Sequence, residues 1–455
     1  MSIQRVGHSL NAFDVKWMVD NYNMIKFLSK SINSPLAKST LLYTGGDAIG
    51  KAIPFFLLPI VTKYLTTTDF GILSNFSVAV QIFTAICALN TYSALTVSYF
   101  SLKEEERASY ISNLIYLICL LAFACLLVVV IFSDLIAQRL GISLLWQILA
   151  IVSSLATSIF MLHTSVLRME KRPIMFSSIQ IFQALIAGLL AIYFVVILKW
   201  NWQGRVLSMV GGSILSVIVS LWLLMKERHI FTKIDVKNIK EAFSFGLPLL
   251  PHTLSFWFKS GVDKIILTNI VSLSANGVYS IALTLVSVIG IFTGSFFNAY
   301  SPLMYKDLSL IDQVSHTESI ELKLKLVKIS YLFSCLLITV CFGCYFMMSW
   351  IIPIFFRGDY LGALRVLPFL MLTLFFEGMY SIVSGYIFYR KKTKVLGSIT
   401  FGSSLLQMAL TIVLVKRFGI MGAAYSSVLV SITTFLLVFG YANTLYELPW
   451  LLRRR

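Results

Sequence analysis

The stretch TLLYTGGDAIGKAIPFFLLPIVTKYL, residues Thr40–Leu65, decides the fold of this chain. It is apolar enough to span a bilayer, yet Asp47 and Lys51 lie one helical turn apart within it, followed by Pro54 and Pro59. A charge near the centre of a spanning helix costs about 2.5–3.5 kcal/mol, so such side chains usually face a protein interior or a wet cavity. A charged first span interrupted by prolines therefore indicates a protein that forms a conduit through the membrane.

Composition places the whole chain among polytopic membrane proteins. Its 455 residues are 58% hydrophobic and 13% charged, whereas soluble proteins carry about 25% charged residues. Since a spanning helix needs about 20 apolar residues, the apolar runs predict an all-α protein with about twelve spans. We expect these spans near residues 40–63, 70–99, 109–133, 143–167, 174–198, 206–225, 243–269, 276–302, 327–352, 363–389, 395–415 and 420–447.

The 37 lysines and arginines are distributed asymmetrically about these spans. If the N-terminus is inside, inner segments hold 26 of them, outer loops hold 8, and three lie within spans. This asymmetry predicts that both termini are cytoplasmic. It also argues against nucleic acid as a partner, because the net charge of +17 follows the topology. The basic clusters are expected to contact anionic membrane lipid; they are 168–172, 390–394 and 453–455.

The same topology assigns individual loop positions to the two sides of the membrane. We expect Glu105, Lys233 and Lys392 to be cytoplasmic and Gly141 and Phe356 to be periplasmic. The two longest inner loops, 226–242 and 303–326, mix charged and apolar residues and are expected to lie along the inner surface.

An internal repeat divides the spans into two sets of six. Thr62–Ser74 reads TKYLTTTDFGILS and Thr268–Ser280 reads TNIVSLSANGVYS, with threonine, glycine and serine matched at an offset of 206 residues. Because six is even, both halves have the same orientation, which predicts a pseudo-twofold axis along the membrane normal. The predicted organisation is a cytoplasmic segment 1–38, an N-lobe 39–226, an inner linker 227–242, a C-lobe 243–447 and a basic tail 448–455.

The first 38 residues contain no apolar core of signal-peptide length. Residues 1–23 have no counterpart in the repeat, so we expect them to be dispensable and Met24 to be a working start.

One motif near the N-terminus has two interpretations. Gly45–Lys51 reads GGDAIGK and matches a phosphate-binding loop up to its last position, where Ala52 replaces the required Ser or Thr. No predicted strand precedes it, so we interpret Gly46 and Gly50 as a small-residue surface for close helix packing. Hydrolase and metalloprotease motifs are absent from the sequence, and all six cysteines lie in apolar spans. The sequence therefore predicts no enzyme, no catalytic residue, no metal and no cofactor.

Charged residues within the spans also allow two interpretations. Asp47 with Lys51, and Lys259 with Asp263, are two acid–base pairs spaced four residues apart, which favours ion pairs within each helix. If Lys264 also met Glu377, all six charges would neutralise one another. Alternatively, the lysines line a central cavity and bind an anionic ligand, because a self-neutral pair offers nothing in lipid that leucines would not. The six residues are Asp47, Lys51, Lys259, Asp263, Lys264 and Glu377.

These segments resemble a known family, the bacterial polysaccharide repeat-unit flippases that translocate O-antigen and capsule units. The run TGGDAIGKAIPFFLLPIVTKYLTTTDFGILSNF resembles the family's first helices, and FGIMGAAYSS near the C-terminus resembles its last-span signature. The run FGLPLLPHTLSFWFKSGVDKIILTNIVSLSANGVYSIA resembles its central motif. The likeness covers roughly residues 36–447. In the central motif the expected residues are Pro248, Asp263, Gly277 and Tyr279.

The resemblance implies two six-helix lobes like those of multidrug extruders (MATE) and the lipid II flippase, a cationic central cavity and alternating access. The implied cargo is an oligosaccharide on undecaprenyl diphosphate, moved from the cytoplasmic to the periplasmic leaflet of the bacterial inner membrane. Its destination would be O-antigen, hence lipopolysaccharide, or a related surface polysaccharide. Membrane lipids, the polymerase and the chain-length regulator of the same pathway are the implied partners.

Candidate site residues follow from this cargo. Lysine suits phosphate as a point charge, so the diphosphate is expected to bind Lys51, Lys259 and Lys264. Their charge partners would be Asp47, Asp263 and Glu377. Polar and aromatic side chains could line the sugars, although core packing competes as the role of any single tyrosine. These candidates are Tyr43, Asn75, Gln81, Tyr92, Asn298 and Tyr300.

Two other function classes remain as alternatives. A multidrug or cation antiporter of the same fold should have acidic residues dominating its cavity, whereas here lysines match them in number. A membrane glycan polymerase should have a large outer loop with catalytic charges, whereas the longest predicted outer loop has only about a dozen residues.

Overall fold

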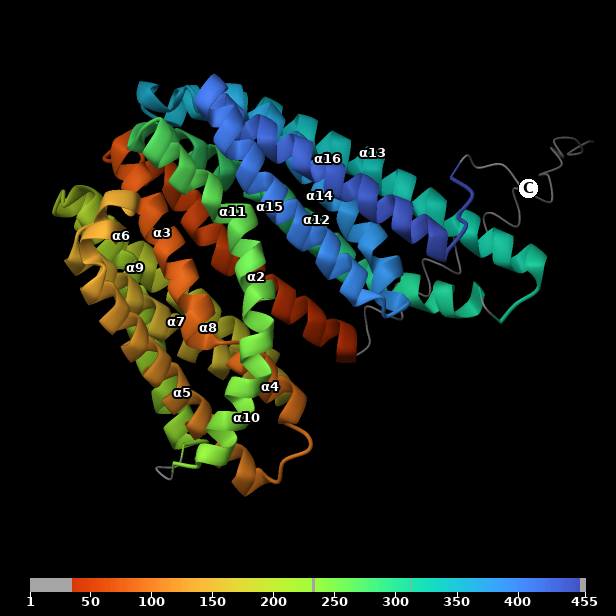
Figure 1. The fold of residues 1–455 in the computed structure, drawn as a ribbon, viewed down its shortest axis with the longest axis horizontal. Helices are drawn as coiled ribbons and strands as arrows, with labels where there is room; N and C mark the ends of the chain where they lie inside the picture. The colour runs from red at the N-terminus through yellow and green to blue at the C-terminus, as the bar shows by residue number, and fades with distance from the viewer. Residues whose placement is uncertain (1–34, 231–233, 312, 451–455) are drawn as a thin grey trace, which may run out of the picture.

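The computed structural model describes residues 35–230, 234–311 and 313–450. Over these ranges the protein is helical, and no strand occurs in them. The helices form two arms that meet at one end and diverge toward the other (Figure 1). We call these the closed end and the open end. The N-terminal segment proposed to be dispensable lies outside the described residues.

The N-terminal arm, which we call the N-bundle, contains the helices up to α9. They are α2 (Pro35–Val61), α3 (Thr67–Ala88), α4 (Thr91–Ser98), α5 (Glu104–Ile131), α6 (Ser133–Leu140), α7 (Leu144–Met169), α8 (Pro173–Ala191), the π-helical turn η1 (Ile192–Ile197) and α9 (Asn201–Lys226). Within this bundle α2 packs on α8, α3 on α7, and α8 on α9.

The remaining helices form a connecting segment and the C-terminal arm, the C-bundle. They are α10 (Val236–Gly246), η2 (Leu247–Leu249), α11 (Leu250–Ile270), α12 (Leu273–Ile311), α13 (His316–Phe355), η3 (Gly358–Tyr360), α14 (Ala363–Tyr389), α15 (Thr393–Phe418) and α16 (Ile420–Leu445). The pairs α11–α15, α12–α14 and α15–α16 pack as their N-bundle counterparts do. α10 instead packs on α4 and α5 of the N-bundle.

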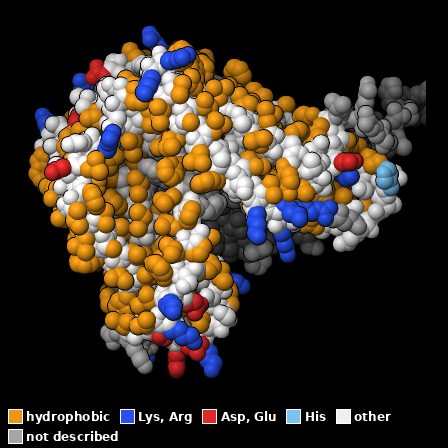
Figure 2. Space-filling view, viewed as in Figure 1, with side chains coloured by type: hydrophobic (Ala, Val, Ile, Leu, Met, Phe, Trp, Pro, Cys, Tyr) orange, Lys and Arg blue, Asp and Glu red, His pale blue; other side chains and the backbone are white. Residues whose placement is uncertain are grey.

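The predicted membrane class is confirmed. Ten described helices are long and apolar enough to cross a membrane. The predicted first and seventh spans correspond to α2 and α11, helices of 27 and 21 residues. In the space-filling view, apolar side chains cover the flanks of both arms, and charged side chains gather at the ends of the N-bundle and on one side of the C-bundle (Figure 2).

The prediction of a long loop over residues 303–326 is wrong, whereas its expected place along the inner membrane surface stays a prediction. α12 continues through Pro302 to Ile311, and α13 already begins at His316. These helices have 39 and 40 residues, so at 1.5 Å per residue each is nearly twice as long as the roughly 30 Å hydrocarbon core. A capping box between Ser315 and Glu318 starts α13 beyond the apolar run, which hydropathy alone does not detect.

Small residues of the first span do pack as predicted. The motif Gly45–Lys51 lies inside helix α2, so it is not a phosphate-binding loop. A side chain at Gly46 would collide with Ser177 of α8, whose hydroxyl donates a 2.7 Å hydrogen bond to the Leu42 carbonyl. Gly50 lies against the backbone of Gln180. The small-residue surface therefore lets α2 and α8 approach closely.

Candidate functional site

The two segments of the internal repeat pack against each other at the closed end. Gly71 of α3 contacts the carbonyl of Leu273, and Gly277 of α12 contacts the carbonyl of Thr67. An offset of 206 residues converts one contact into the other, so the pairing is reciprocal, as a pseudo-twofold axis requires. At both positions a Cβ atom would collide with backbone, so only glycine permits this approach.

Hydrogen bonds join the two bundles around these glycines. The hydroxyls of Ser74 and Ser280, which are equivalent in the repeat, lie 2.7 Å apart, as do those of Thr67 and Ser274. The buried Asn276 amide donates to the Asn75 side chain at 2.9 Å. We call the contacts between residues 62–75 and 268–280 the seam. Hydrogen bonds between membrane helices average about 0.6 kcal/mol each, so these few bonds hold the seam closed only moderately.

Of the proposed sugar-lining residues, Asn75 belongs to the seam. Its amide donates to Thr268 at 3.1 Å and to the Leu140 carbonyl at 2.8 Å. Tyr300 is buried in an apolar cluster of the C-bundle, where its ring lies 5.7 Å from that of Phe296. Asn298 is exposed on α12, and the preceding residue, Phe297, packs against the same cluster.

Two other proposed sugar-lining residues share a cavity. It has a volume of about 290 Å³ and lies in the N-bundle where α3, α4 and α7 meet the first turn of α11. The Tyr92 hydroxyl donates to the Asn90 side chain at 3.3 Å, and Asn90 in turn bonds Thr253 of α11 at 3.0 Å. The polar side chains that line the cavity are uncharged: Gln81, Thr84, Asn90, Tyr92, Thr157 and Thr253.

The proposed cavity charges lie on three different helices. Lys51 is exposed on α2, Lys264 is half-buried on α11, and Glu377 is half-buried on α14. Asp263 is buried, and it accepts a 2.7 Å hydrogen bond from the Tyr279 hydroxyl of α12. This bond connects two of the family-like positions in the second half. The side chains of Tyr43, Asp47 and Lys259 lie outside the described residues.

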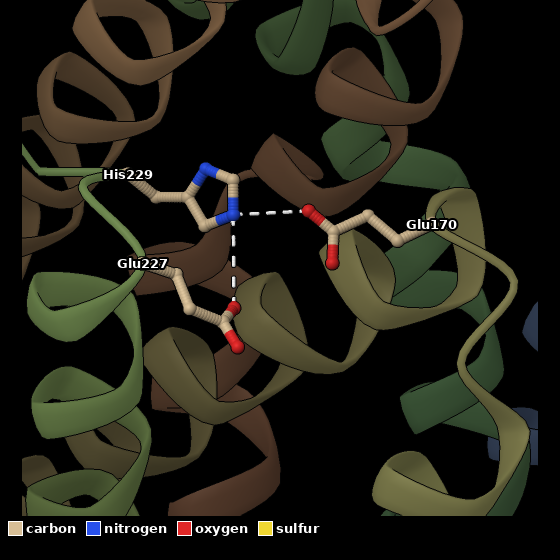
Figure 3. Close-up of side chains that lie close together, drawn as sticks. All are labelled: Glu170, Glu227 and His229. Carbon is tan, nitrogen blue, oxygen red and sulfur yellow. Dashed lines mark ion pairs between the residues drawn. The ribbon is translucent and has the colours of Figure 1, made fainter.

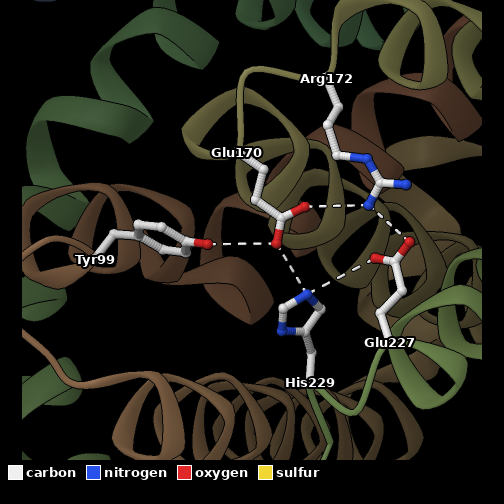
Figure 4. A network of polar contacts seen from close by, with 5 residues as sticks. All are labelled: Tyr99, Glu170, Arg172, Glu227 and His229. Atoms are coloured by element: carbon white, nitrogen blue, oxygen red, sulfur yellow. Dashed lines mark hydrogen bonds and ion pairs between the residues drawn. The ribbon is translucent and has the colours of Figure 1, made fainter.

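A network of ion pairs that the sequence did not reveal lies at the open end of the N-bundle. Figure 3 shows three of its members, Glu170, Glu227 and His229. His229 Nε2 lies 2.9 Å from Glu170 Oε1 and 3.7 Å from Glu227 Oε2. Arg172 Nη1 lies 3.2 Å from Glu170 and 2.7 Å from Glu227 (Figure 4). The Tyr99 hydroxyl donates to Glu170 at 3.4 Å. The network therefore ties together the α4–α5, α7–α8 and α9–α10 connections.

This cluster has the ligand types of a metal site, but its electrostatics differ. The nearest carboxylate and imidazole atoms of Glu170, Glu227 and His229 all lie within 4.8 Å of one another. However, Arg172 already provides the cation that both carboxylates require. We therefore interpret it as an ion-pair network. Burial alone would raise the pKa of Glu170, but its hydrogen bonds and charge interactions with His229 and Arg172 outweigh burial and lower that pKa.

The network should stabilise the N-bundle in a pH-dependent way. Because the Glu170 pKa is lowered on folding, its contribution is present above the ordinary carboxyl pKa and is lost as pH falls through the lowered value. Glu227→Gln should lower the free energy of unfolding by about 1 kcal/mol, since Arg172 is partly exposed and solvent screens the pair. Thermal unfolding in detergent at pH 7 measures this change. Asp359→Asn, which breaks an exposed 3.5 Å pair with Arg357, should have almost no effect; equal losses in both variants would contradict the assignment.

Comparisons with known proteins agree with this architecture. A family described as "Polysaccharide biosynthesis protein" matches residues 36–306. The "Lsg locus putative protein 1" of Haemophilus influenzae is 24% identical over 388 residues, covering 82% of this chain and 89% of that protein.

Two groups of solved structures share the fold. An inward-facing multidrug resistance MATE family transporter has a TM-score of 0.65 at 11% identity, covering 89% of this chain and 96% of its own. The lipid II flippase MurJ in an inward closed conformation also has a TM-score of 0.65, at 17% identity, covering 89% of this chain and 87% of its own. At these identities the likeness establishes the fold alone, an arrangement of two helical bundles.

Proposed function

Because this chain belongs to the polysaccharide biosynthesis protein family, we propose that it is a flippase for lipid-linked oligosaccharides. Its substrate would be an oligosaccharide repeat unit on undecaprenyl diphosphate, destined for O-antigen or a related surface polysaccharide. The protein would move it from the cytoplasmic to the periplasmic leaflet of the inner membrane by alternating access. In this proposal the N-lobe 39–226 and the C-lobe 243–447 are the two moving bodies, and the polymerase and chain-length regulator act on the product.

The seam is the observation that carries this proposal. It joins α3 of the N-bundle to α11 and α12 of the C-bundle at the closed end, through glycine contacts and hydrogen bonds that are individually weak. Away from the seam, Thr253 in the first turn of α11 also bonds Asn90 of the N-bundle. An interface of this kind can separate and re-form, as alternating access requires. The open end, where the arms diverge (Figure 1), would face the cytoplasm in this state. The protein would then be poised to accept a substrate from the inner leaflet.

The polar groups of the two bundles suit the two parts of such a substrate. Lys51, Lys259 and Lys264 belong to α2 and α11, the first helix of each half, and would bind the diphosphate. Gln81 and Tyr92 line a cavity whose surface is mostly apolar and whose polar side chains are uncharged; these polar groups suit the hydroxyl groups of a sugar. The cavity's volume of about 290 Å³ is at the small end of ligand pockets, so it would admit one sugar ring rather than a whole repeat unit.

A reconstitution experiment tests the proposal. Purified protein in liposomes should move a fluorescent undecaprenyl-diphosphate oligosaccharide between leaflets, and a strain lacking the gene should lose a surface glycan. Liposomes with the same protein and a fluorescent phosphatidylcholine provide the control for nonspecific lipid scrambling. Equal movement of both lipids, or an unchanged glycan profile in the deletion strain, would contradict the proposed function.

The orientation makes a separate prediction. In a background without native cysteines, Glu105→Cys and Lys392→Cys should be protected from an impermeant thiol reagent in intact cells, because the basic inner loops remain in the cytoplasm. Ser143→Cys and Asp359→Cys should be labelled, because both positions are exposed. Asp359 lies in the predicted outer loop with Phe356, and Ser143 begins the predicted span that follows the loop with Gly141. Labelling of the Lys392→Cys variant together with protection of Ser143→Cys would reverse the topology.

A further inference from the structure

Two turns at the open end have the same backbone geometry although they differ in charge. The N-turn, Glu170–Arg172, joins α7 to α8, and the C-turn, Arg390–Lys392, joins α14 to α15. Their central lysines have φ values of 56° and 55°. In both turns the third residue's N–H bonds to the carbonyl five positions earlier, at 2.9 and 3.1 Å. The turns are therefore structural counterparts in the two bundles.

The N-turn is largely neutralised by carboxylates. Arg172 contacts both Glu170 and Glu227, as Figure 4 shows. The guanidinium of Arg168 lies over the Phe176 ring at 5.2 Å. Counting Lys171, three basic and two acidic residues meet here, which leaves one net positive charge before His229 is considered.

The three residues of the C-turn are all basic, and Lys394 follows two positions later with no acidic residue between. Arg390 lies over the ring of Tyr446 at 4.5 Å, which anchors the turn to the C-bundle. Lys391, Lys392 and Lys394 are exposed, and none of the ion pairs found between described residues includes them. Figure 2 shows basic side chains without acidic neighbours on the side of the C-bundle that faces the diverging N-bundle, whereas both signs mix at the N-bundle tip.

We propose that the C-turn and Lys394 form a docking site for a phosphate-bearing lipid headgroup. The inference rests on the proposed function for its preferred occupant, the diphosphate of the lipid-linked substrate as it approaches the open end. If the basic residues of these turns served only to orient the protein in the membrane, we would expect the two turns to have the same net charge. Here one turn is compensated by carboxylates and the other leaves its lysines available. A headgroup with about two negative charges would bind more strongly than one with a single charge.

The counterpart turns provide matched variants. Lys391→Asn, Lys392→Gln and Lys394→Gln, combined, remove the available charges, and Arg390 is kept because it packs on Tyr446. Lys171→Asn is the control, since it changes the equivalent position of the N-turn. Asparagine is chosen at both central positions because it tolerates positive φ.

Binding is measured in nanodiscs of phosphatidylcholine, with undecaprenyl diphosphate and phosphatidylglycerol as separate probes. The triple variant should bind undecaprenyl diphosphate about tenfold or more weakly, and the Lys171→Asn protein should stay within about twofold of the parent. Equal weakening for both probes would support the phosphate site with bulk lipid as its source. Unchanged binding of both probes by the triple variant would overturn the site.

The same experiment separates this inference from the proposed function. If the parent protein binds undecaprenyl diphosphate and the triple variant binds it equally well, the docking site fails and the flippase proposal stands. If the parent protein shows no binding of undecaprenyl diphosphate but the triple variant loses phosphatidylglycerol binding, the docking site stands and the proposed substrate fails.

Discussion

Export of surface glycan should fall about tenfold or more when Gly277 is replaced by alanine. The added Cβ would collide with the carbonyl oxygen of Thr67, which belongs to backbone and cannot rotate away. The helices α3 and α12 would have to separate, and overpacking of this kind typically costs about 1–3 kcal/mol. Such a cost shifts the population away from the state with a closed seam about fivefold to more than a hundredfold. Gly71→Ala should act similarly, because it makes the reciprocal contact with Leu273.

A glycine on the same helix provides the control. A Cβ at Gly290 of α12 would meet no neighbouring atom within 4 Å, so Gly290→Ala should leave export unchanged. The seam itself is monitored by Thr67→Cys with Ser274→Cys, whose hydroxyl oxygens lie 2.7 Å apart in the parent protein. Disulfide formation should decrease in the Gly277→Ala background. Full export together with unchanged cross-linking would show that the seam tolerates the methyl group.

The Lys51→Ala substitution, which removes the amino group, should also reduce glycan export about tenfold to a hundredfold. Hydrogen bonds to charged groups contribute about 1.5–3 kcal/mol, and each 1.4 kcal/mol is a tenfold change in affinity. Lys51→Arg should retain part of the activity, because it keeps the charge. Lys63→Ala, which removes an exposed lysine just beyond the end of α2, should have little effect. Export is compared at matched protein abundance in the membrane.

A double variant distinguishes substrate binding from a purely structural ion pair. If Lys51 only neutralises Asp47, then Asp47→Ala combined with Lys51→Ala should restore both folding and export. If Lys51 binds the diphosphate, the double variant should fold normally but remain defective. Full export by the double variant would remove Lys51 from the proposed binding site. Lys259 and Asp263 have the same spacing in the sequence, so the same comparison applies to them.

The seam at the closed end shows how much of a site can be predicted from an internal sequence repeat. The sequence reveals that Gly71 and Gly277 are equivalent, because both occur nine residues after a matched threonine. It does not reveal that each glycine contacts the segment of the other half. Whether two equivalent segments meet depends on how the bundles tilt relative to each other, and no local pattern records that tilt. The placement of Asn75 in the seam rather than along an open cavity has the same origin.

Membrane class, approximate span positions and the twofold repeat were determined by the sequence alone, because burial in lipid demands long apolar segments. Only the tertiary structure decided how the polar residues are paired. Tyr99, Glu170 and His229 come from three separate connections yet share one network. The N-turn and the C-turn both have basic clusters in the sequence. The N-turn includes one carboxylate, Glu170, and the fold brings a second, Glu227, from the end of α9. Whether two charges neutralise each other depends on the distance between them in space, and neither hydropathy nor residue spacing gives that distance.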